Sequence, residues 1–268
     1  MVFSPLVHTR QGSGEPVVLI HGIGHRRQAW GPVFDRLSER YDVIAVDLAG
    51  FGESPAFPAG VPYTMDVACE HLGEQFAAWG VERPHVVGNS LGGAIALELG
   101  ARGLASSVTA LSPAGFFGRF DRYQALGILS VLRLVAQLPD RLLAVAARSA
   151  LGRRLIGLAL YAHPERHDRE RTYGDALALK HCEGFEAVAK EGLDYEFALD
   201  VTVPTTVAWG TKDRILPYRQ SARARHRLPQ AHHVPLVGAG HVPMSDSPDE
   251  IVALVDATVG RARTGAAA

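Results

Sequence analysis

The chain has 268 residues, of which 47% are hydrophobic and 21% are charged, and its formal net charge is −1. This composition is typical of a globular protein, and the length fits one large α/β domain better than two separate domains. A charge so close to zero provides no basic surface for nucleic acid, so we expect no nucleic-acid partner.

The histidines and cysteines indicate neither a metal site nor a disulfide framework. The twelve histidines are scattered and lack the spacing of zinc ligands, and the adjacent pair His232-His233 is interpreted as structural or exposed. Cys69 and Cys182 lie far apart and are expected to be buried free thiols. We therefore predict no metal and no cofactor.

Two further segments bear on where the protein acts. Residues 1–5 lack the basic and apolar regions of a secretory signal, which predicts a cytoplasmic protein. The most apolar region, residues 125–160, is interrupted by Pro139 and by charged residues such as Arg133 and Asp140. No uninterrupted window of about 18 apolar residues remains, so no membrane span is predicted.

Short apolar runs alternate with helical patterns along the chain. The runs suited to buried parallel strands are 17–20, 43–46, 86–87, 108–111, 205–209 and 233–237. Residues 66–79 carry apolar side chains at helical spacing, and residues 93–99 are also helix-like. This alternation predicts a mostly parallel, doubly wound α/β sheet.

The alternation stops between about Phe117 and Lys190, where the sequence resembles helix after helix. We interpret residues 117–190 as a helical cap, or lid, inserted between two strands of a core domain formed by residues 1–116 and 191–262. Such a cap would lie over the carboxyl ends of the strands, where open α/β sheets bind ligands. Residues 263–268 are expected to be a disordered tail.

Ser90 lies in the sequence Gly88-Asn89-Ser90-Leu91-Gly92, between an apolar strand and a helix. A sharp turn there would present the serine hydroxyl, and glycine two residues before and after it would avoid crowding. The Leu91 N–H would lie at the start of the helix, where it can stabilise negative charge. This pattern indicates a nucleophile, and the alternative is a glycine-rich turn with an incidental serine.

Two candidate partners for the serine follow the returning strands. Asp213 comes after the strand 205–209, and His241 comes after the strand 233–237. A serine hydroxyl needs a base within hydrogen-bond reach, and the base needs a group that orients it. We assign His241 as the base and Asp213 as the orienting acid, in the chain order Ser–Asp–His. Taken singly, Asp213 would be a loop-capping carboxylate and His241 a surface histidine.

The segment His21-Gly22-Ile23-Gly24 follows another strand, and its glycines allow the backbone to approach a ligand. The Ile23 N–H together with that of Leu91 would form an oxyanion hole. His21 is interpreted as a buried structural histidine, and Asp47 as a turn-forming carboxylate.

These motifs resemble the α/β-hydrolase fold superfamily, in the serine hydrolase branch with a helical cap after the sixth strand. The similarity extends from the His21-Gly22 loop through residues 47–54 and 88–93 to residues 209–217 and 240–243. Asp246 stands where many relatives have an acidic residue after the histidine. Dehalogenase and epoxide hydrolase relatives carry aspartate at the position of Ser90, and the serine argues against those activities.

The resemblance implies hydrolysis of a small or medium carboxylic ester with an apolar acyl part, through an acyl-enzyme on Ser90. One alternative is a carbon–carbon bond hydrolase acting on a vinylogous diketone, which Asn89 favours and the sequence His25-Arg26-Arg27 and Val242 disfavour. A second alternative is a homologue that binds a ligand without turnover. The expected partner is a small, mostly apolar molecule, and the oligomeric state is left open.

Overall fold

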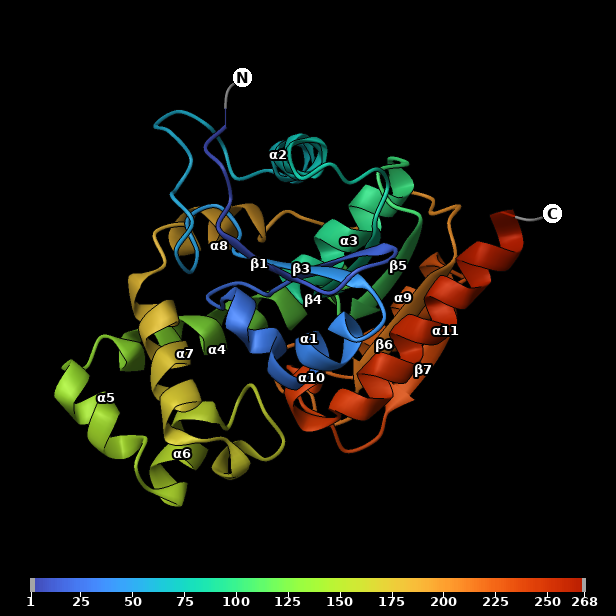
Figure 1. Cartoon of the computed structure of the whole chain (residues 1–268). Helices are drawn as coiled ribbons and strands as arrows, with labels where there is room; N and C mark the ends of the chain where they lie inside the picture. The colour runs from blue at the N-terminus through green and yellow to red at the C-terminus, as the bar shows by residue number, and fades with distance from the viewer. Residues whose placement is uncertain (1–2, 267–268) are drawn as a thin grey trace.

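A computed structural model describes residues 3–266 of the chain. Its centre is a seven-stranded sheet with the order β1-β3-β2-β4-β5-β6-β7 (Figure 1). The strands are β1 (His8–Gln11), β2 (Pro16–Ile20), β3 (Asp42–Val46), β4 (His85–Asn89), β5 (Ser107–Leu111), β6 (Thr205–Gly210) and β7 (His232–Leu236). All neighbouring strands are parallel except β1, which is antiparallel to β3. The predicted fold class is confirmed.

Helices cover both faces of the sheet, and successive strand residues point to opposite faces. Val18 and Ile20 of β2 belong to a core with α2 (Met65–Ala78), α3 (Leu91–Ala101) and α9 (Gln220–Arg227). Val17 and Leu19 belong to a second core with α1 (Gly31–Ser38) and α11 (Pro248–Ala266). Because both faces are buried, the central strands are continuously apolar rather than alternating.

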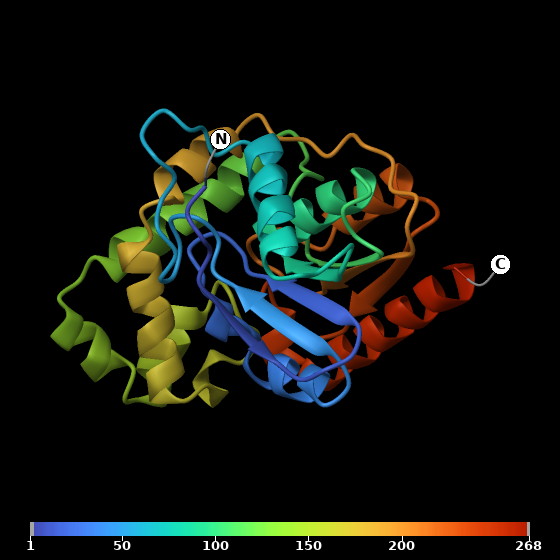
Figure 2. The same ribbon diagram turned by 45° about the horizontal axis from the view of Figure 1, so that its top comes forward.

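A helical insertion lies between β5 and β6 and projects to one side of the sheet (Figure 2). Its helices are α4 (Asp121–Ala136), α5 (Asp140–Ala146), α6 (Ala150–Gly157), the short 3₁₀ helix η2 (Pro164–Arg166), α7 (Arg169–His181) and α8 (Phe185–Glu191). The sequence predicts that the cap follows the sixth strand. In the described residues it follows the fifth strand, β5, so that prediction is one strand too high. Residues 3–7, ahead of β1, form no strand.

Residues 263–266 are not the tail that the sequence analysis expected. They form the last turn of α11, where Arg263 pairs with Glu15 at 2.8 Å and Thr264 Oγ1 lies 3.0 Å from the Arg261 carbonyl. A charged side chain anchored to the loop before β2 accounts for the extension. Residues 267 and 268 lie outside the described residues.

Strand β1 was also missing from the sequence interpretation, because its four side chains are polar and exposed. Its place at the sheet edge removes the need for an apolar face. In the part of the chain that the structure describes, no helix is long and apolar enough to cross a membrane.

Candidate functional site

Ser90 occupies a strained turn between β4 and α3. Its φ is 57° and its ψ is −115°, a backbone conformation that is uncommon for a residue with a side chain. A Cβ on Gly88 would collide with the Gly92 carbonyl, and a Cβ on Gly92 would collide with the Ile20 carbonyl. The two glycines are therefore required by close backbone packing, as the sequence pattern predicts.

Two backbone amides close to Ser90 have no hydrogen-bond acceptor among the described residues. Leu91 is the first residue of α3, so its N–H has no partner inside the helix. The Ile23 N–H makes no hydrogen bond to any residue between 3 and 266. Both residues line the same cavity as Ser90, so both amides are available to an oxygen atom bound there.

Asp213 and His241 form a buried hydrogen-bonded pair. His241 Nδ1 lies 2.8 Å from Asp213 Oδ2, and the two residues are only 3% and 6% exposed. The other carboxylate oxygen, Oδ1, accepts the N–H groups of Ile215 at 2.9 Å and Leu216 at 2.8 Å. Since a carboxylate only accepts, the pair fixes the proton on Nδ1 and leaves Nε2 as a base.

The structure forms no hydrogen bond between Ser90 Oγ and His241 within residues 3–266. The two residues are linked through Asn89, whose side-chain Nδ2 donates to the His241 carbonyl at 2.9 Å and to the Leu111 carbonyl at 3.1 Å. This positioning contact was missed, although Asn89 directly precedes the serine.

Asp246 makes no hydrogen bond or ion pair with His241 among residues 3–266, but it holds the loop that carries His241. Its carboxylate accepts the Gly240 N–H at 2.8 Å and the Ala162 N–H at 3.0 Å, and its Oδ1 lies 3.4 Å from the His163 nitrogen. Ala162 and His163 belong to the helical insertion. One carboxylate therefore ties the insertion to the loop before His241.

His21 makes the buried structural contacts that the sequence analysis expects. Its Nε2 accepts the Leu48 N–H at 3.0 Å, so the proton on Nδ1 points to the Gly22 carbonyl at 2.7 Å. Complete burial lowers the pKa of His21. A neutral ring bonded at both nitrogens is not available as a second base.

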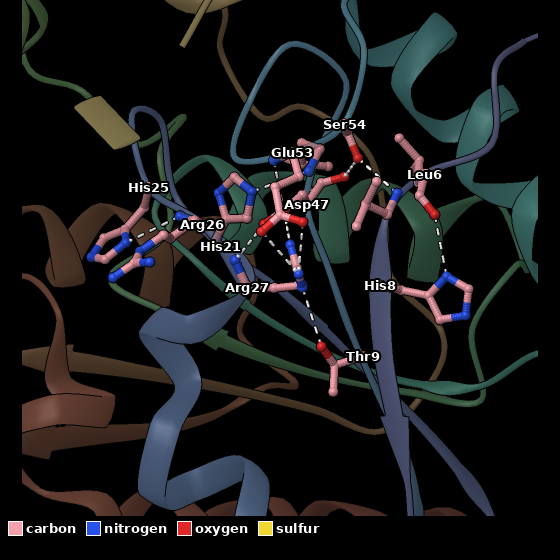
Figure 3. Close-up of polar contacts among 12 residues, drawn as sticks. Leu6, His8, Thr9, His21, His25, Arg26, Arg27, Asp47, Glu53 and Ser54 are labelled. Carbon is pink, nitrogen blue, oxygen red and sulfur yellow. Dashed lines mark hydrogen bonds and ion pairs between the residues drawn. The ribbon is translucent and has the colours of Figure 1, made fainter. Parts of the chain in front are cut away.

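Asp47 also behaves as the turn-forming carboxylate that was predicted. Figure 3 shows it facing Arg27, whose side chain pairs with Asp47 and Glu53 and reaches Thr9 at 3.1 Å. Asp47 also accepts the N–H groups of Arg27 at 2.5 Å and Glu53 at 3.0 Å. The contacts of Asp47 hold the Arg27 end of the segment that contains Ile23.

A chain of hydrogen bonds joins this segment to the insertion. His25 Nδ1 accepts the Arg26 N–H at 3.1 Å, so Nε2 donates to Tyr161 Oη at 3.1 Å. Tyr161 in turn donates to Asp175 at 3.1 Å, and Arg26 pairs with Asp175 at 3.2 Å. Burial lowers the pKa of His25 to about 4. This network could not be predicted from local sequence patterns, because its members are far apart in the chain.

A cavity of about 420 Å³ opens beside Ser90. Its apolar lining comes from the core and from the insertion: Ile23, Leu91, Phe117, Ala125, Leu126, Leu129, Val188, Ala189, Ile215 and Leu216. Its far end is charged and includes Glu98, which bonds Tyr195 at 3.1 Å and pairs with Arg102 at 2.9 Å. The cavity suits a mostly apolar group at the serine and a polar group farther along α3.

Within residues 3–266 no cluster of histidine, cysteine and carboxylate side chains could hold a metal ion. The two cysteines, Cys69 and Cys182, are free and buried.

The chain is similar in sequence to known hydrolases. Residues 17–254 match a family described as the Alpha/beta hydrolase family. The chain is 32% identical over 206 residues to the epoxide hydrolase EphH of Mycobacterium tuberculosis, covering 70% of this chain and 92% of the relative. It is 29% identical over 262 residues to a pimeloyl-acyl-carrier-protein methyl ester esterase of Aeromonas salmonicida, covering 94% and 98%.

A solved structure of similar fold is that of the meta-cleavage product hydrolase CumD of Pseudomonas fluorescens. It superposes with a TM-score of 0.75 at 22% sequence identity, over 96% of this chain and 94% of CumD.

Proposed function

The chain belongs to the alpha/beta hydrolase family, and we propose that it is a serine hydrolase that cleaves a carboxylic ester with an apolar acyl part. The observation that carries the proposal is the buried 2.8 Å hydrogen bond between Asp213 and His241, in a chain whose strained turn presents Ser90 to an apolar cavity. In this proposal residues 1–116 and 191–262 are the catalytic core, and residues 117–190 are its cap.

The first half of the reaction acylates the enzyme. Ser90 Oγ attacks the ester carbonyl while His241 Nε2 takes the hydroxyl proton. The carbonyl oxygen becomes negative and is held by the N–H groups of Ile23 and Leu91. His241 then gives its proton to the departing alcohol, which leaves the acyl group on Ser90.

The second half releases the acid. His241 removes a proton from water, the resulting oxygen attacks the acyl carbonyl, and the proton returns to Ser90 as the bond breaks. Asp213 keeps the imidazole ring oriented throughout and stabilises its protonated form. No cofactor is needed for either step.

The relatives guide the choice of substrate without fixing it. One named relative acts on a methyl ester and another on epoxides. A serine at the turn favours the ester chemistry, because acyl transfer to a hydroxyl proceeds through the oxyanion site described above. The apolar wall of the cavity favours an acyl group without charge near the carbonyl.

The test is covalent labelling with a fluorophosphonate probe, followed by mass spectrometry to locate the modified residue. We expect one adduct, on Ser90, which Ser90→Ala abolishes and which Ser13→Ala leaves unchanged because Ser13 lies on an exposed loop. Labelling that persists in Ser90→Ala would overturn the assignment, and a folded protein that never reacts would favour a ligand-binding homologue.

Turnover then distinguishes the reactions open to the same serine. A series of p-nitrophenyl esters of increasing acyl length is compared with a vinylogous diketone. We expect hydrolysis of the esters, with a preference within the series, and little cleavage of the diketone. The reverse preference would replace the ester proposal with carbon–carbon bond hydrolysis.

A further inference from the structure

The outer surface of the helical insertion is unusually apolar. Most of the large apolar side chains exposed in residues 3–266 lie in this one segment. They are Phe120, Tyr123, Val131, Leu134, Val135, Leu138, Leu142, Val145, Leu151, Leu155 and Leu158. Leu134, Leu151 and Leu155 are 71%, 69% and 67% exposed. Single exposed apolar residues are common on proteins, but a concentration of this kind indicates an interaction surface.

The exposed residues follow the helices with regular spacing. On α4 they recur at positions 131, 134 and 135, and on α6 at positions 151 and 155, while Leu138 and Leu158 follow directly after these helices. Helix α5 adds Leu142 and Val145. We call the exposed apolar side chains between residues 131 and 158 the outer apolar face.

The exposed sides of α4 and α6 border each other. Val131 and Val135 of α4 and Leu155 of α6 line one hollow of about 190 Å³, which reaches inward to Ile23 and His25. In Figures 1 and 2, α5 and α6 lie at the end of the molecule opposite the carboxyl end of α11. The outer apolar face is therefore a projecting surface, away from the sheet.

Positive charge surrounds this face. The side chains of Arg141, Arg148 and Arg154 are exposed and make no ion pair with any other residue between 3 and 266. The one acid of α5 and α6, Asp140, is paired with Lys180 at 2.7 Å. The charge of Arg154 acts on Glu165, and Glu165 itself pairs with His163 at 3.4 Å. Since the whole chain has a net charge of −1, the positive charge is local.

We propose that the outer apolar face docks on the surface of a lipid bilayer that contains anionic lipids. Leucine and valine side chains would enter the boundary between headgroups and acyl chains, and the three arginines would contact anionic headgroups. The helices are short and amphipathic, which fits a surface contact rather than a span. The charge favours this occupant over a second copy of the chain, because a symmetric contact through the same face would bring the arginines of both copies together.

The test is flotation of the protein with extruded vesicles. One set contains phosphatidylcholine alone, and the other contains phosphatidylcholine with phosphatidylglycerol. We expect binding to the anionic vesicles to be at least ~10-fold tighter than to the neutral ones, and weaker in high salt. Equal binding to both sets, or no binding to anionic vesicles, would overturn the proposal.

Two groups of variants separate the contributions. Leu142→Ser with Leu151→Ser should abolish binding to both vesicle sets, and Arg141→Glu with Arg148→Glu should remove the preference for anionic lipid. Val237→Ser is the matched control, because Val237 is 80% exposed but follows β7, outside the insertion. Thermal unfolding and fluorophosphonate labelling of Ser90 should stay as in the parent protein, since none of these residues lines the cavity beside Ser90.

Light scattering after size-exclusion chromatography distinguishes the competing occupant. A dimer that dissociates when Leu142 and Leu151 are replaced by serine would show that a second copy covers the face. We expect the parent protein and these variants to have the same mass in solution. The vesicle result does not depend on catalysis, so the Ser90→Ala protein should bind equally well.

Discussion

The carboxyl edge of the sheet, where the parallel strands end, and the helical insertion both border the cavity beside Ser90. Different interactions stabilise these two regions. At the carboxyl edge of the sheet, the side chains of Asp213, Asn89 and Asp246 each form hydrogen bonds with two or more backbone groups. In the insertion, Leu129 of α4 and Phe185 of α8 pack into the apolar core, and long cationic side chains also join the helices, as where Arg133 donates to the Leu179 carbonyl at 2.8 Å. Directional bonds fix orientation, whereas apolar packing mainly fixes volume.

This difference implies a division of labour. The proposed chemistry requires the atoms of Ser90, His241 and Asp213 to be oriented accurately, and the sheet edge provides bonds that do so. Selecting an acyl group requires a shaped apolar space, which the insertion helps to form. Changes at the sheet edge should therefore affect rate, and changes on the inner side of α4 should affect preference.

The largest effect is expected for Asp213→Asn. The amide oxygen can still accept the Ile215 and Leu216 N–H groups, but the side chain no longer stabilises a protonated His241. We expect kcat for a p-nitrophenyl ester to fall by about 10⁴-fold with a small change in Tm. Asp35→Asn, on an exposed part of α1, is the control. A loss smaller than about tenfold would remove Asp213 from the proposed mechanism.

The junction between the two regions should be sensitive to pH. The pKa of His25 is about 4 in the folded protein, against 6.5 for an unperturbed histidine. Between these pH values the unfolded chain binds a proton that the folded chain does not. The stability contributed by the neutral ring is thus present above pH 6.5 and is lost as the pH falls toward 4.

From the size of this shift, the loss amounts to about 3 kcal/mol for His25. Urea unfolding at several pH values should show a steeper decline for the parent protein than for His25→Asn. His232→Asn should decline like the parent, because His232 is exposed. Parallel curves for the parent and His25→Asn would contradict the prediction. Burial also lowers the pKa of His21 and His71, so part of the decline should remain.

The smallest effect is expected inside the cavity. Leu126→Ala with Val188→Ala enlarges the apolar wall, and we expect preference to shift by about tenfold toward longer acyl chains. The rate of Ser90 labelling should change little. Leu134→Ala changes an exposed residue of α4 that does not line the cavity and should leave the preference unaltered. An unchanged preference in the double variant would mean that the insertion does not select the acyl group.

The sequence predicts the sheet edge better than the insertion, and the reason is physical. Turn chemistry is local, so Gly88, Ser90 and Gly92 indicate the sharp turn by themselves, and parallel strands bring their carboxyl ends to one edge. The contacts of Asn89, Asp246 and Tyr161 join residues distant in the chain and leave no local pattern. The polar strand β1 was missed because one side of it faces no core, and the last turn of α11 because Arg263 is anchored by Glu15.

The two edge strands of the sheet, β1 and β7, are both poor templates for the addition of further strands. An exposed sheet edge can template the addition of strands from other chains, and aggregation often begins there. At one edge, β1 presents exposed polar side chains, including Arg10, which pairs with Asp42 at 2.6 Å. At the other edge, β7 contains Pro235, which has no N–H to offer an incoming strand. Both ends of the sheet thus discourage strand addition, which matters in a protein that keeps so much apolar surface on its insertion.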